Sequence, residues 1–469
     1  MIIKSGLLRS LIVLLVRPAM KKYILSVLLF IAFTGVALVA VSTVSLGQTV
    51  NKLKIDSLLG AAAADNQAMG SLAISKNGSI AFQKAVGYSN VSAGKLTQAN
   101  IKTHYRIGSI SKMFTATMIF QLIEEGKLTL DTKLSVYFPQ LPNAEQITIA
   151  QMLSHRSGLY NFVADTAYQT YMVNPRTRTE MLAVFAAQPS DFTPDTKAEY
   201  SNTNYVLLGY IIEDITKKTY AETLKQKITR KLGLLDTYYG GKAEPAKNEA
   251  LSYQFSNVWR QMPETDMSIP AGAGAVVSTP TDLVKFIEGL FTGKLINTEH
   301  LTLMKTIQDG FGMGLFQIPL GAKKAFGHNG DIDGFSSVVG YFPEEKVAYA
   351  YCSNGVDYPV KELVNGALKI YFNLPYSIPV FKTPVLTIAE LDKYVGNYSS
   401  LRIPIKIVVT RDGTSLMAQA TGQAPFALKP LAKDKFGFAL AGIVMEFRPI
   451  FGEFTLKQGG GAFPFTKDE

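Results

Sequence analysis

The sequence predicts an α+β fold, in which one antiparallel sheet is flanked by helices from a helix-rich insert, with a small all-β domain after it. Patterns typical of hairpin strands occur near both ends of the first 375 residues. Between them lies a long stretch in which apolar residues recur at helical spacing. After Tyr394 that spacing stops, and short apolar runs alternate with glycine-containing turns. Together these observations indicate a sheet covered by helices, followed by a barrel-like β domain.

The first predicted elements are a helix over Leu53–Ala64 and a hairpin after it. Apolar runs at Leu72–Ile74 and Ile80–Val86 flank the dipeptide Asn77-Gly78. Asn-Gly between two such runs favours a tight hairpin turn, because both residues tolerate positive φ angles. The hairpin therefore supplies two neighbouring strands of the sheet.

Two helices are predicted in the insert, over Met113–Glu125 and Thr203–Thr216, because apolar residues recur there every three or four positions. A second pair of antiparallel strands is predicted at Phe335–Val339 and Lys346–Cys352. The segment Val360–Phe372 is predicted as a closing helix. The sheet would thus receive strands from both ends of the first domain.

Changes of composition divide the chain into four segments. Three prolines within a dozen residues predict a stiff linker between the two domains. The segments are a signal peptide or membrane anchor at residues 1–47, a first domain at 50–375, the linker at 376–388 and a small β domain at 389–469. All candidate catalytic residues fall in the first domain.

The first segment has the three parts of an export signal. Lys21 and Lys22 precede a mostly apolar stretch from Tyr23 to Val41, and small and polar residues follow up to Gln48. The apolar stretch is also near the length that spans a bilayer, so an uncleaved anchor is the alternative. Met20 is an alternative start, since Met-Lys-Lys opens a conventional signal. In either case we expect the bulk of the protein to be exported, to the periplasm or the cell exterior.

The formal charge of +10 does not indicate nucleic-acid binding, because half of it comes from residues 1–47, which hold five basic residues and no acidic one. The rest of the chain has no basic run or aromatic-interleaved patch, so its charges are interpreted as solvated surface. The single cysteine, Cys352, lies in an apolar strand pattern, which predicts a buried thiol and excludes an internal disulfide. The four histidines are dispersed, and we expect neither a metal site nor a cofactor.

Ser109 and Lys112 form the first candidate catalytic motif, Ser-Ile-Ser-Lys. Ser109 opens a predicted helix, so the two side chains fall three positions apart on one face. There the helix dipole favours developing negative charge, and partial burial lowers the pKa of Lys112 toward that of a base. The alternative is a helix-capping serine followed by an ordinary lysine. Ser92 and Lys95 have the same spacing, but Gly94 and a turn between strands argue against a helix there.

The second motif is Tyr200-Ser201-Asn202, just before the second predicted helix. A phenol near an ammonium group would have a depressed pKa, so Tyr200 is a candidate to move a proton between Ser109 and the leaving group. Asn202 is a candidate to hydrogen-bond the substrate. In the alternative interpretation Ser201 or Asn202 caps the helix, and a cap and a site residue are compatible in this loop. The motif occurs once more, as Tyr88-Ser89-Asn90.

The third motif, His328-Asn329-Gly330, precedes the predicted strand at Phe335. Glycine allows close approach of two backbones, and a strand edge can bind an extended substrate and supply an amide to an oxyanion. Taken alone, His328 is more simply a surface or core histidine. The order of the three motifs favours the catalytic interpretation.

With these motifs the chain resembles the serine β-lactamase and penicillin-binding superfamily, in the branch that contains class C β-lactamases, a secreted DD-carboxypeptidase type, D-aminopeptidases and related esterases. The stretches Met152–Leu159, Ala271–Gly274 and Ser278–Leu283 add to the resemblance, which covers roughly residues 55–375. It implies a β-lactamase/transpeptidase-like fold for the first domain. The stretch Tyr394–Tyr398 resembles the small lipocalin-like domain appended to some members.

The resemblance also implies roles for single residues at the matching positions. The implied catalytic residues are Ser109, Lys112 and Tyr200. The implied substrate-binding residues are Asn202, His328 and Gly330, and the backbone amides of Ser109 and Asp331 would form the oxyanion hole. His155, in the stretch Met152–Leu159, is interpreted as structural.

The resemblance implies an exported serine hydrolase that forms an acyl-enzyme on a peptide-like amide or an ester, as a DD-peptidase or D-aminopeptidase does. The third motif begins with histidine where β-lactamases of this branch usually have lysine, and Asp331 follows it; both features disfavour substrates that carry a carboxylate. The alternatives are a β-lactamase with antibiotic turnover and a slowly deacylating penicillin-binding sensor. The expected partner is a small or peptide substrate, with the cell wall as one source. Membrane contact is expected only through an uncleaved N-terminal segment.

Overall fold

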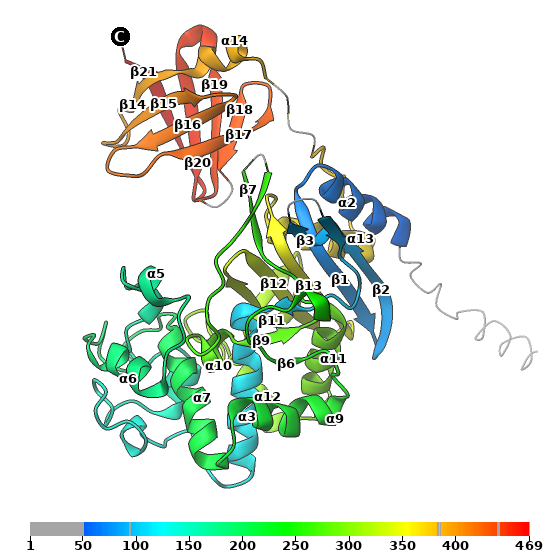
Figure 1. Ribbon diagram of the computed structural model, residues 1–469, viewed down its shortest axis with the longest axis vertical. Coiled ribbons are helices and arrows are strands. Elements are labelled where there is room, and N and C mark those ends of the chain that lie inside the picture. The colour runs from blue at the N-terminus through cyan, green and yellow to red at the C-terminus, as the bar shows by residue number, and fades with distance from the viewer. Residues whose placement is uncertain are drawn as a thin grey trace, which may run out of the picture.

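The computed structural model describes residues 51–92, 95–256, 258–381, 384, 386–438 and 441–468. The predicted export segment at residues 1–47 lies outside these residues. Among the helices described, none is both long and apolar enough to cross a bilayer. Figure 1 shows a mixed body of helices and sheet, and a β-barrel beyond it. The predicted fold class, an α+β body followed by a small β-barrel, is therefore confirmed.

A six-stranded antiparallel sheet forms the centre of the first body, with the strand order β10-β11-β12-β13-β1-β2. Its strands are β1 (Ala68–Lys76), β2 (Ser79–Val86), β10 (Phe316–Leu320), β11 (Lys323–Ile332), β12 (Phe335–Phe342) and β13 (Val347–Val356). Both predicted hairpins are present, as β1–β2 and β12–β13. They join where β1 pairs with β13, with Leu72 opposite Tyr351, so the two ends of the first domain meet in one sheet.

Helices cover both faces of this sheet. Helices α2 (Lys52–Ala64) and α13 (Val360–Tyr371) pack together on one face, and α11 (Pro280–Phe291) packs on the other. The central strands β1 and β13 are buried along nearly their whole length, Cys352 included. Strands buried on both faces have near-continuous apolar sequences, which explains why the runs in β1 and β13 show little alternation.

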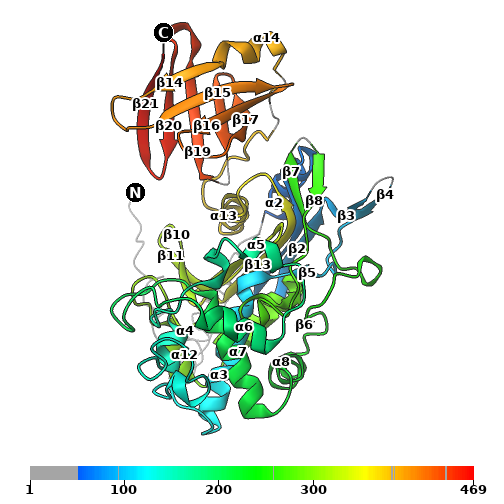
Figure 2. The same ribbon diagram turned by 60° about the vertical axis from the view of Figure 1, so that its left-hand side comes forward.

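The insert between β2 and β10 supplies the remaining helices of the first body. They are α3 (Ser111–Glu124), α4 (Ile149–Leu153), α5 (Tyr168–Tyr171), α6 (Arg178–Ala186), α7 (Asn202–Thr216), α8 (Tyr220–Leu224), α9 (Arg230–Leu232), α10 (Ala271–Gly274) and α12 (Thr298–Lys305). Figure 1 places α5 and α6 on the side of the body away from α2, and the turn to Figure 2 brings them to the front. Helix α3 is buried from Ser111 to Leu122 and packs against α7 and α10, so the residues at its start lie deep in the body.

Three short sheets link the insert to the central sheet. They are β3 (Tyr88–Ser92) with β4 (Lys95–Gln98), β5 (Tyr105–Arg106) with β9 (Val276–Ser278) and β6 (Tyr238–Tyr239), and β7 (Tyr253–Ser256) with β8 (Val258–Gln261). The strand β5 leads directly to the Ser109 motif.

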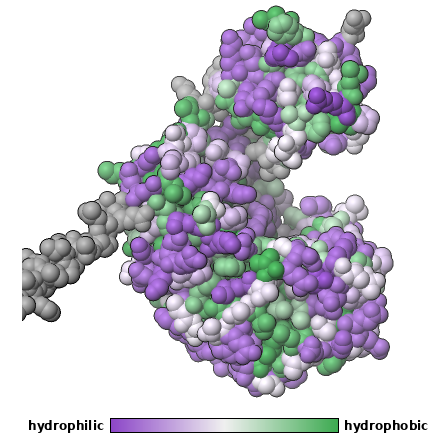
Figure 3. Space-filling model, turned by 180° about the vertical axis from the view of Figure 1, so that it is seen from behind, coloured by the Kyte–Doolittle hydropathy of each residue, from purple (hydrophilic) through white to green (hydrophobic). Residues whose placement is uncertain are grey.

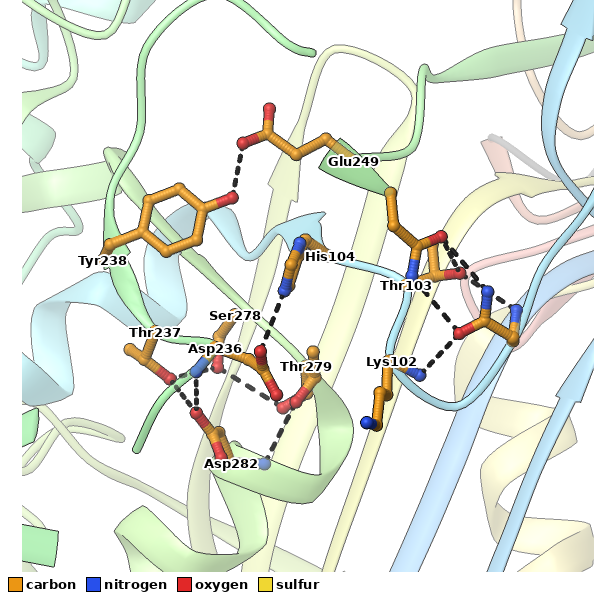
Figure 4. Close-up of polar contacts among 12 residues, drawn as sticks. Lys102, Thr103, His104, Asp236, Thr237, Tyr238, Glu249, Ser278, Thr279 and Asp282 are labelled. Carbon is orange, nitrogen blue, oxygen red and sulfur yellow. Dashed lines mark hydrogen bonds and ion pairs between the residues drawn. The ribbon is translucent and has the colours of Figure 1, made fainter. Parts of the chain in front are cut away.

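The stretch that begins at Ser278 has a structural role. Thr279 caps α11 by accepting a hydrogen bond from the Asp282 amide at 3.2 Å. Asp282 Oδ2 accepts from the Asp236 amide at 2.9 Å and from Thr237 Oγ1 at 3.0 Å, and His104 Nε2 lies 3.2 Å from Asp236 Oδ1. Figure 4 shows that these contacts tie the sheet of β5, β6 and β9 to α11.

The C-terminal part closes into an eight-stranded antiparallel barrel around its own apolar core. Helix α14 (Ile388–Leu391) precedes the strands β14 (Gly396–Ser399), β15 (Lys406–Asp412), β16 (Ser415–Ala420), β17 (Phe426–Ala432), β18 (Lys435–Phe438), β19 (Ile443–Arg448), β20 (Glu453–Gln458) and β21 (Gly461–Lys467). Figure 3 shows the barrel as a separate lobe of the surface. Lys429 of β17 contacts the first body, where it pairs with Asp357 and donates to Gln67 Oε1 at 2.6 Å.

Candidate active site

Ser109 lies in a 3₁₀ turn, Gly108–Ile110, between β5 and α3. The α-helix begins at Ser111, two residues after Ser109 and two residues before the predicted range of Met113–Glu125, and Ser109 and Lys112 still face each other. Gly108 has φ +50°, and a Cβ on it would lie 2.9 Å from the Asp331 nitrogen. A side chain therefore does not fit there, and this glycine lets the turn that carries Ser109 approach β11.

Lys112 reaches back along α3 to Ser109. Its Nζ lies 2.9 Å from Ser109 Oγ, 2.7 Å from Asn202 Oδ1 and 2.9 Å from the Ala273 carbonyl oxygen. The side chain is fully buried, and burial holds the pKa of Lys112 well below its usual value. The pKa of Lys112 is therefore lowered, as predicted. The buried amine has three polar neighbours: one hydroxyl and two carbonyl oxygens.

Those neighbours fix the orientation of the amine when it is neutral. A neutral amine has two N–H donors and one lone pair, and the oxygens of Asn202 and Ala273 only accept. The two N–H groups therefore point at these oxygens, and the lone pair is left for the hydroxyl of Ser109. In this state Ser109 donates its O–H to Lys112, which is the geometry that a general base needs.

Tyr200 approaches Ser109 from the other side, from the loop before α7. Its hydroxyl donates to Ser109 Oγ at 2.7 Å. Burial raises the pKa of Tyr200, and the nearby carboxylate of Asp331 raises it further. We expected a depressed pKa, but that required an ammonium group, and the low pKa of Lys112 favours the neutral amine. Tyr200 is thus a protonated donor to Ser109.

Two side chains, those of Asn161 and His155, hold the loop that carries Tyr200. Asn161 Oδ1 accepts from the backbone N of Asn202 at 3.0 Å and from its Nδ2 at 3.1 Å. Ser201 occupies the N-cap position of α7 but makes no side-chain cap bond there. Because Asn202 Nδ2 donates to Asn161, the other end of this side-chain amide, Oδ1, is directed at Lys112. Asn161 stands in no motif that the sequence alone would single out.

His155 packs under Tyr200, with 4.5 Å between the ring centroids. Its Nδ1 accepts from the Ser201 amide at 3.2 Å, and burial keeps the pKa of this ring well below its usual value. Neutral His155 therefore orients the Tyr200 loop, which agrees with the structural role expected of it.

The third motif precedes β12, which begins at Phe335 as predicted, and it lies inside a further strand, β11, that was not predicted. Strand β10 pairs with β11 only as far as Gly327, and β12 pairs with its other edge as far as Ile332. The Ser109 turn packs beside the part of β11 that β10 leaves uncovered. A Cβ on Gly330 would lie 2.0 Å from the Ile107 carbonyl oxygen and 2.8 Å from the Ser109 nitrogen. The close backbone approach expected at Gly330 is therefore present.

His328 is only 2% exposed, and its Nδ1 contacts the Asn329 carbonyl. Burial, together with Lys112, lowers the pKa of His328 to about 3, so the ring is neutral at physiological pH. Asp331 is exposed. The site therefore combines two basic side chains that favour their neutral forms with one exposed carboxylate.

Two aromatic residues that the motifs did not indicate stand beside the site. The Phe316 ring lies 4.4 Å from that of His328, and the Phe311 ring lies 6.4 Å from that of Tyr200 and 5.7 Å from Phe316. Both phenylalanines are partly exposed. They form an apolar wall beside His328 and Tyr200. Within the described ranges, no group of three metal-ligating side chains is found.

The β-lactamase family model matches residues 55–370, more than half of the chain. The chain belongs to the β-lactamase family. Among curated relatives, penicillin-binding protein 4* of Bacillus subtilis (strain 168) is 24% identical over 412 residues, which are 81% of this chain and 90% of that protein. Teichoic acid D-alanine hydrolase of Staphylococcus aureus is 29% identical over 259 residues, 53% of this chain and 62% of that protein.

Two solved structures are also similar to this chain. D-amino acid amidase from Ochrobactrum anthropi SV3, complexed with L-phenylalanine, is 30% identical, with a TM-score of 0.60 over 68% of this chain and 98% of that one. An octameric penicillin-binding protein homologue from Pyrococcus abyssi has a TM-score of 0.61, covers 89% of this chain and 100% of that one, and is 24% identical. The second likeness concerns the fold and extends beyond the first domain.

Membership of the β-lactamase family confirms the resemblance drawn from the motifs. The protein is a serine hydrolase of the β-lactamase and DD-peptidase type, and its relatives support peptide-like substrates.

Proposed function

We propose that this β-lactamase-family enzyme hydrolyses amides or esters of small D-amino acids, or short peptides that contain them, through an acyl-enzyme on Ser109. The observation that carries the proposal is the position of Ser109 Oγ, 2.9 Å from Lys112 Nζ and 2.7 Å from the Tyr200 hydroxyl. A serine hydroxyl is a weak nucleophile until a neighbouring base takes its proton. Here the buried amine is that base.

In acylation, Ser109 Oγ attacks the carbonyl carbon of the substrate and its proton passes to the lone pair of Lys112. The negative charge that develops on the carbonyl oxygen is taken by the backbone amides of Ser109 and Asp331. The bond to the leaving amine or alcohol then breaks. Tyr200 gives the leaving group its proton and regains one from Lys112, which restores the neutral amine.

Deacylation uses the same groups in reverse. A water molecule gives a proton to the Tyr200 and Lys112 pair and attacks the ester carbon, and the proton returns to Ser109 Oγ as the acid is released. Asn202 contributes by holding Lys112 in the orientation described above, and its position beside the nucleophile makes it a substrate contact. His328 and Gly330 line the strand edge along which an extended substrate would lie.

The charges near Ser109 favour a substrate with an amino group over one with a carboxylate. Neutral His328 offers little attraction to an anion, and the exposed carboxylate of Asp331 repels one and attracts an ammonium group. The Phe311 and Phe316 rings suit an apolar side chain on the acyl group. D-amino acid amidase and teichoic acid D-alanine hydrolase are named for D-amino acid derivatives, which supports this choice.

Export is part of the proposal and rests on the sequence pattern of residues 1–47. A β-lactamase activity and a slowly deacylating sensor use the same acyl-enzyme. They differ from the proposed hydrolase only in which acyl group is accepted and how fast water releases it.

The test compares wild type with Ser109→Ala, and with Ser92→Ala as a matched control. Substrates are D- and L-phenylalanine p-nitroanilides, a p-nitrophenyl ester and a fluorescent penicillin, followed by absorbance and intact mass. We expect turnover of the D-anilide that falls at least about 10³-fold in Ser109→Ala and stays unchanged in Ser92→Ala. Rapid penicillin turnover would instead indicate a β-lactamase, and a lasting penicillin adduct without turnover a sensor. Equal activity of wild type and Ser109→Ala on every probe would contradict the proposal.

A further inference from the structure

Arg106 and Asp333 form a buried ion pair at the margin of the site. Arg106 is the last residue of β5, three positions before Ser109, and Asp333 lies in the turn between β11 and β12, two positions after Asp331. Arg106 Nη1 donates to Asp333 Oδ2 at 3.0 Å, and the two side chains are 4% and 0% exposed. The pair therefore connects the segment of the nucleophile to the segment of the second proposed oxyanion amide.

Arg106 and Asp333 also both bond to Thr265, in the segment that follows β8. Arg106 donates to the carbonyl oxygens of Thr265 and Gly241, each at 2.9 Å, and to Glu264 Oε2 at 2.8 Å. Asp333 Oδ1 accepts from the backbone N of Thr265 at 3.1 Å and from its Oγ1 at 2.7 Å. Each carboxylate oxygen of Asp333 thus has its own donor, and a fork of this kind restrains orientation as well as distance.

Between the ion pair and Ser109, the two backbones touch without intervening side chains. The Asp331 nitrogen lies 2.9 Å from the Cβ position of Gly108, and the Ser109 nitrogen lies 2.8 Å from that of Gly330. An oxyanion hole works only when both amides lie about 2.7–3.1 Å from the developing negative oxygen. A relative shift of the two segments by a fraction of an ångström would therefore weaken it.

We propose that Arg106 and Asp333 are positioning residues, which hold the amides of Ser109 and Asp331 at the spacing required by the tetrahedral intermediate. The inference rests on the proposed function, since it concerns the same acyl transfer. Neither side chain touches the substrate. Their contribution is made in the transition state and not in substrate binding, because the second amide is engaged fully only when the oxyanion forms.

The experiment uses Asp333→Asn and Arg106→Lys in the full chain. Asparagine keeps the shape of Asp333 but loses the charge, and lysine keeps the charge of Arg106 but loses the planar fork. Asp214→Asn is the control for removing the charge of an ion-paired carboxylate elsewhere in the first body, because Asp214 accepts two hydrogen bonds from Arg178, at 2.7 and 2.6 Å, between α6 and α7. The readouts are kcat and KM on the p-nitrophenyl ester, thermal unfolding, and the Ki of a boronic acid that forms a tetrahedral adduct with Ser109.

For Asp333→Asn we expect kcat to fall about 10- to 100-fold, below the loss of a whole oxyanion donor, with KM changed less than threefold. The Ki of the boronic acid should rise by a similar factor, while Asp214→Asn stays within twofold of wild type in both. Arg106→Lys gives the second measurement if Asp333→Asn does not fold. Folded variants that keep kcat and Ki within twofold of wild type would overturn the inference, as would a loss of kcat with an unchanged Ki. If wild type itself shows no turnover that depends on Ser109, the proposed function fails and the inference fails with it.

Discussion

Two segments of this chain carry serine and lysine at the same spacing, in surroundings that differ in every physical respect. Ser92 and Lys95 belong to the small hairpin of β3 and β4, where both are exposed and Ser92 Oγ contacts the Lys95 carbonyl oxygen at 3.3 Å. Ser109 and Lys112 lie at the start of α3, where Lys112 is fully buried and its Nζ contacts Ser109 Oγ at 2.9 Å. Ser92 thus contacts the backbone of its lysine, whereas Ser109 contacts the side-chain amine of its lysine.

The repeated Tyr-Ser-Asn motif shows the same contrast. Asn90 accepts a hydrogen bond from the Tyr253 hydroxyl at 3.0 Å, which fastens β3 to β7. Asn202 instead holds Lys112 at 2.7 Å. The two Tyr-Ser-Asn sets are buried to a similar degree, and the difference lies in their neighbours. Asn202 lies beside the buried Lys112, and burial lowers the pKa of that amine. Motif spacing alone therefore carries little chemical information.

The largest expected difference between the two segments concerns the lysines. Lys112→Arg should lower kcat/KM about 10³-fold, because arginine stays protonated and cannot accept the proton of Ser109. Lys95→Arg should leave kcat/KM unchanged. Ester hydrolysis measures both, with Lys112→Met as a neutral variant of similar size and circular dichroism to establish that each protein folds. Retention of more than a tenth of wild-type activity in Lys112→Arg would mean that another group is the base.

The pH profile sharpens the comparison further. Burial holds the pKa of Lys112 well below its usual value, and only the neutral amine accepts a proton. As pH falls through that pKa, Lys112 becomes protonated and kcat/KM should fall about tenfold per pH unit. Activity is thus fully present above the pKa of Lys112 and lost below it.

His328 provides the control for this assignment. Its pKa is lowered to about 3, so the ring stays neutral at neutral and mildly acidic pH. His328→Asn should therefore leave the midpoint of the acid limb in place, whatever it does to the absolute rate. Disappearance of that limb in His328→Asn would assign the titration to the histidine, and circular dichroism across the same pH range excludes acid unfolding as the cause.

The smallest expected effect concerns Asp331, whose exposed carboxylate contrasts with the buried groups around it. Asp331→Asn keeps the backbone amide and the size of the side chain but removes the charge. We expect hydrolysis of nitrocefin, which carries a carboxylate, to rise about two- to tenfold, and the gain to shrink as salt is added. A substrate with a free amino group should be hydrolysed more slowly. Equal nitrocefin rates for the two proteins would mean that Asp331 does not select against carboxylates.

Local sequence patterns predicted most of the sheet and the long helices. The Asn77-Gly78 turn lies between β1 and β2, and the helices predicted over Leu53–Ala64, Thr203–Thr216 and Val360–Phe372 match α2, α7 and α13 to within one residue at each end. These elements are predictable because their own residues carry the apolar period that defines them. Strand β11 was missed, since glycines and polar residues interrupt its apolar pattern.

The candidate site divides in the same way between sequence and tertiary structure. Residue types in order along the chain were sufficient to single out Ser109, Lys112 and Tyr200, and the family match follows from the same stretches. Three features join segments far apart in the chain, so no local pattern predicts them. They are the hydrogen bonds between Asn161 and Asn202, the contacts of Phe311 and Phe316 with Tyr200 and His328, and the ion pair of Arg106 with Asp333. Protonation belongs to this second group as well, because the low pKa of Lys112 and the raised pKa of Tyr200 arise from burial, and burial exists only once the chain has folded.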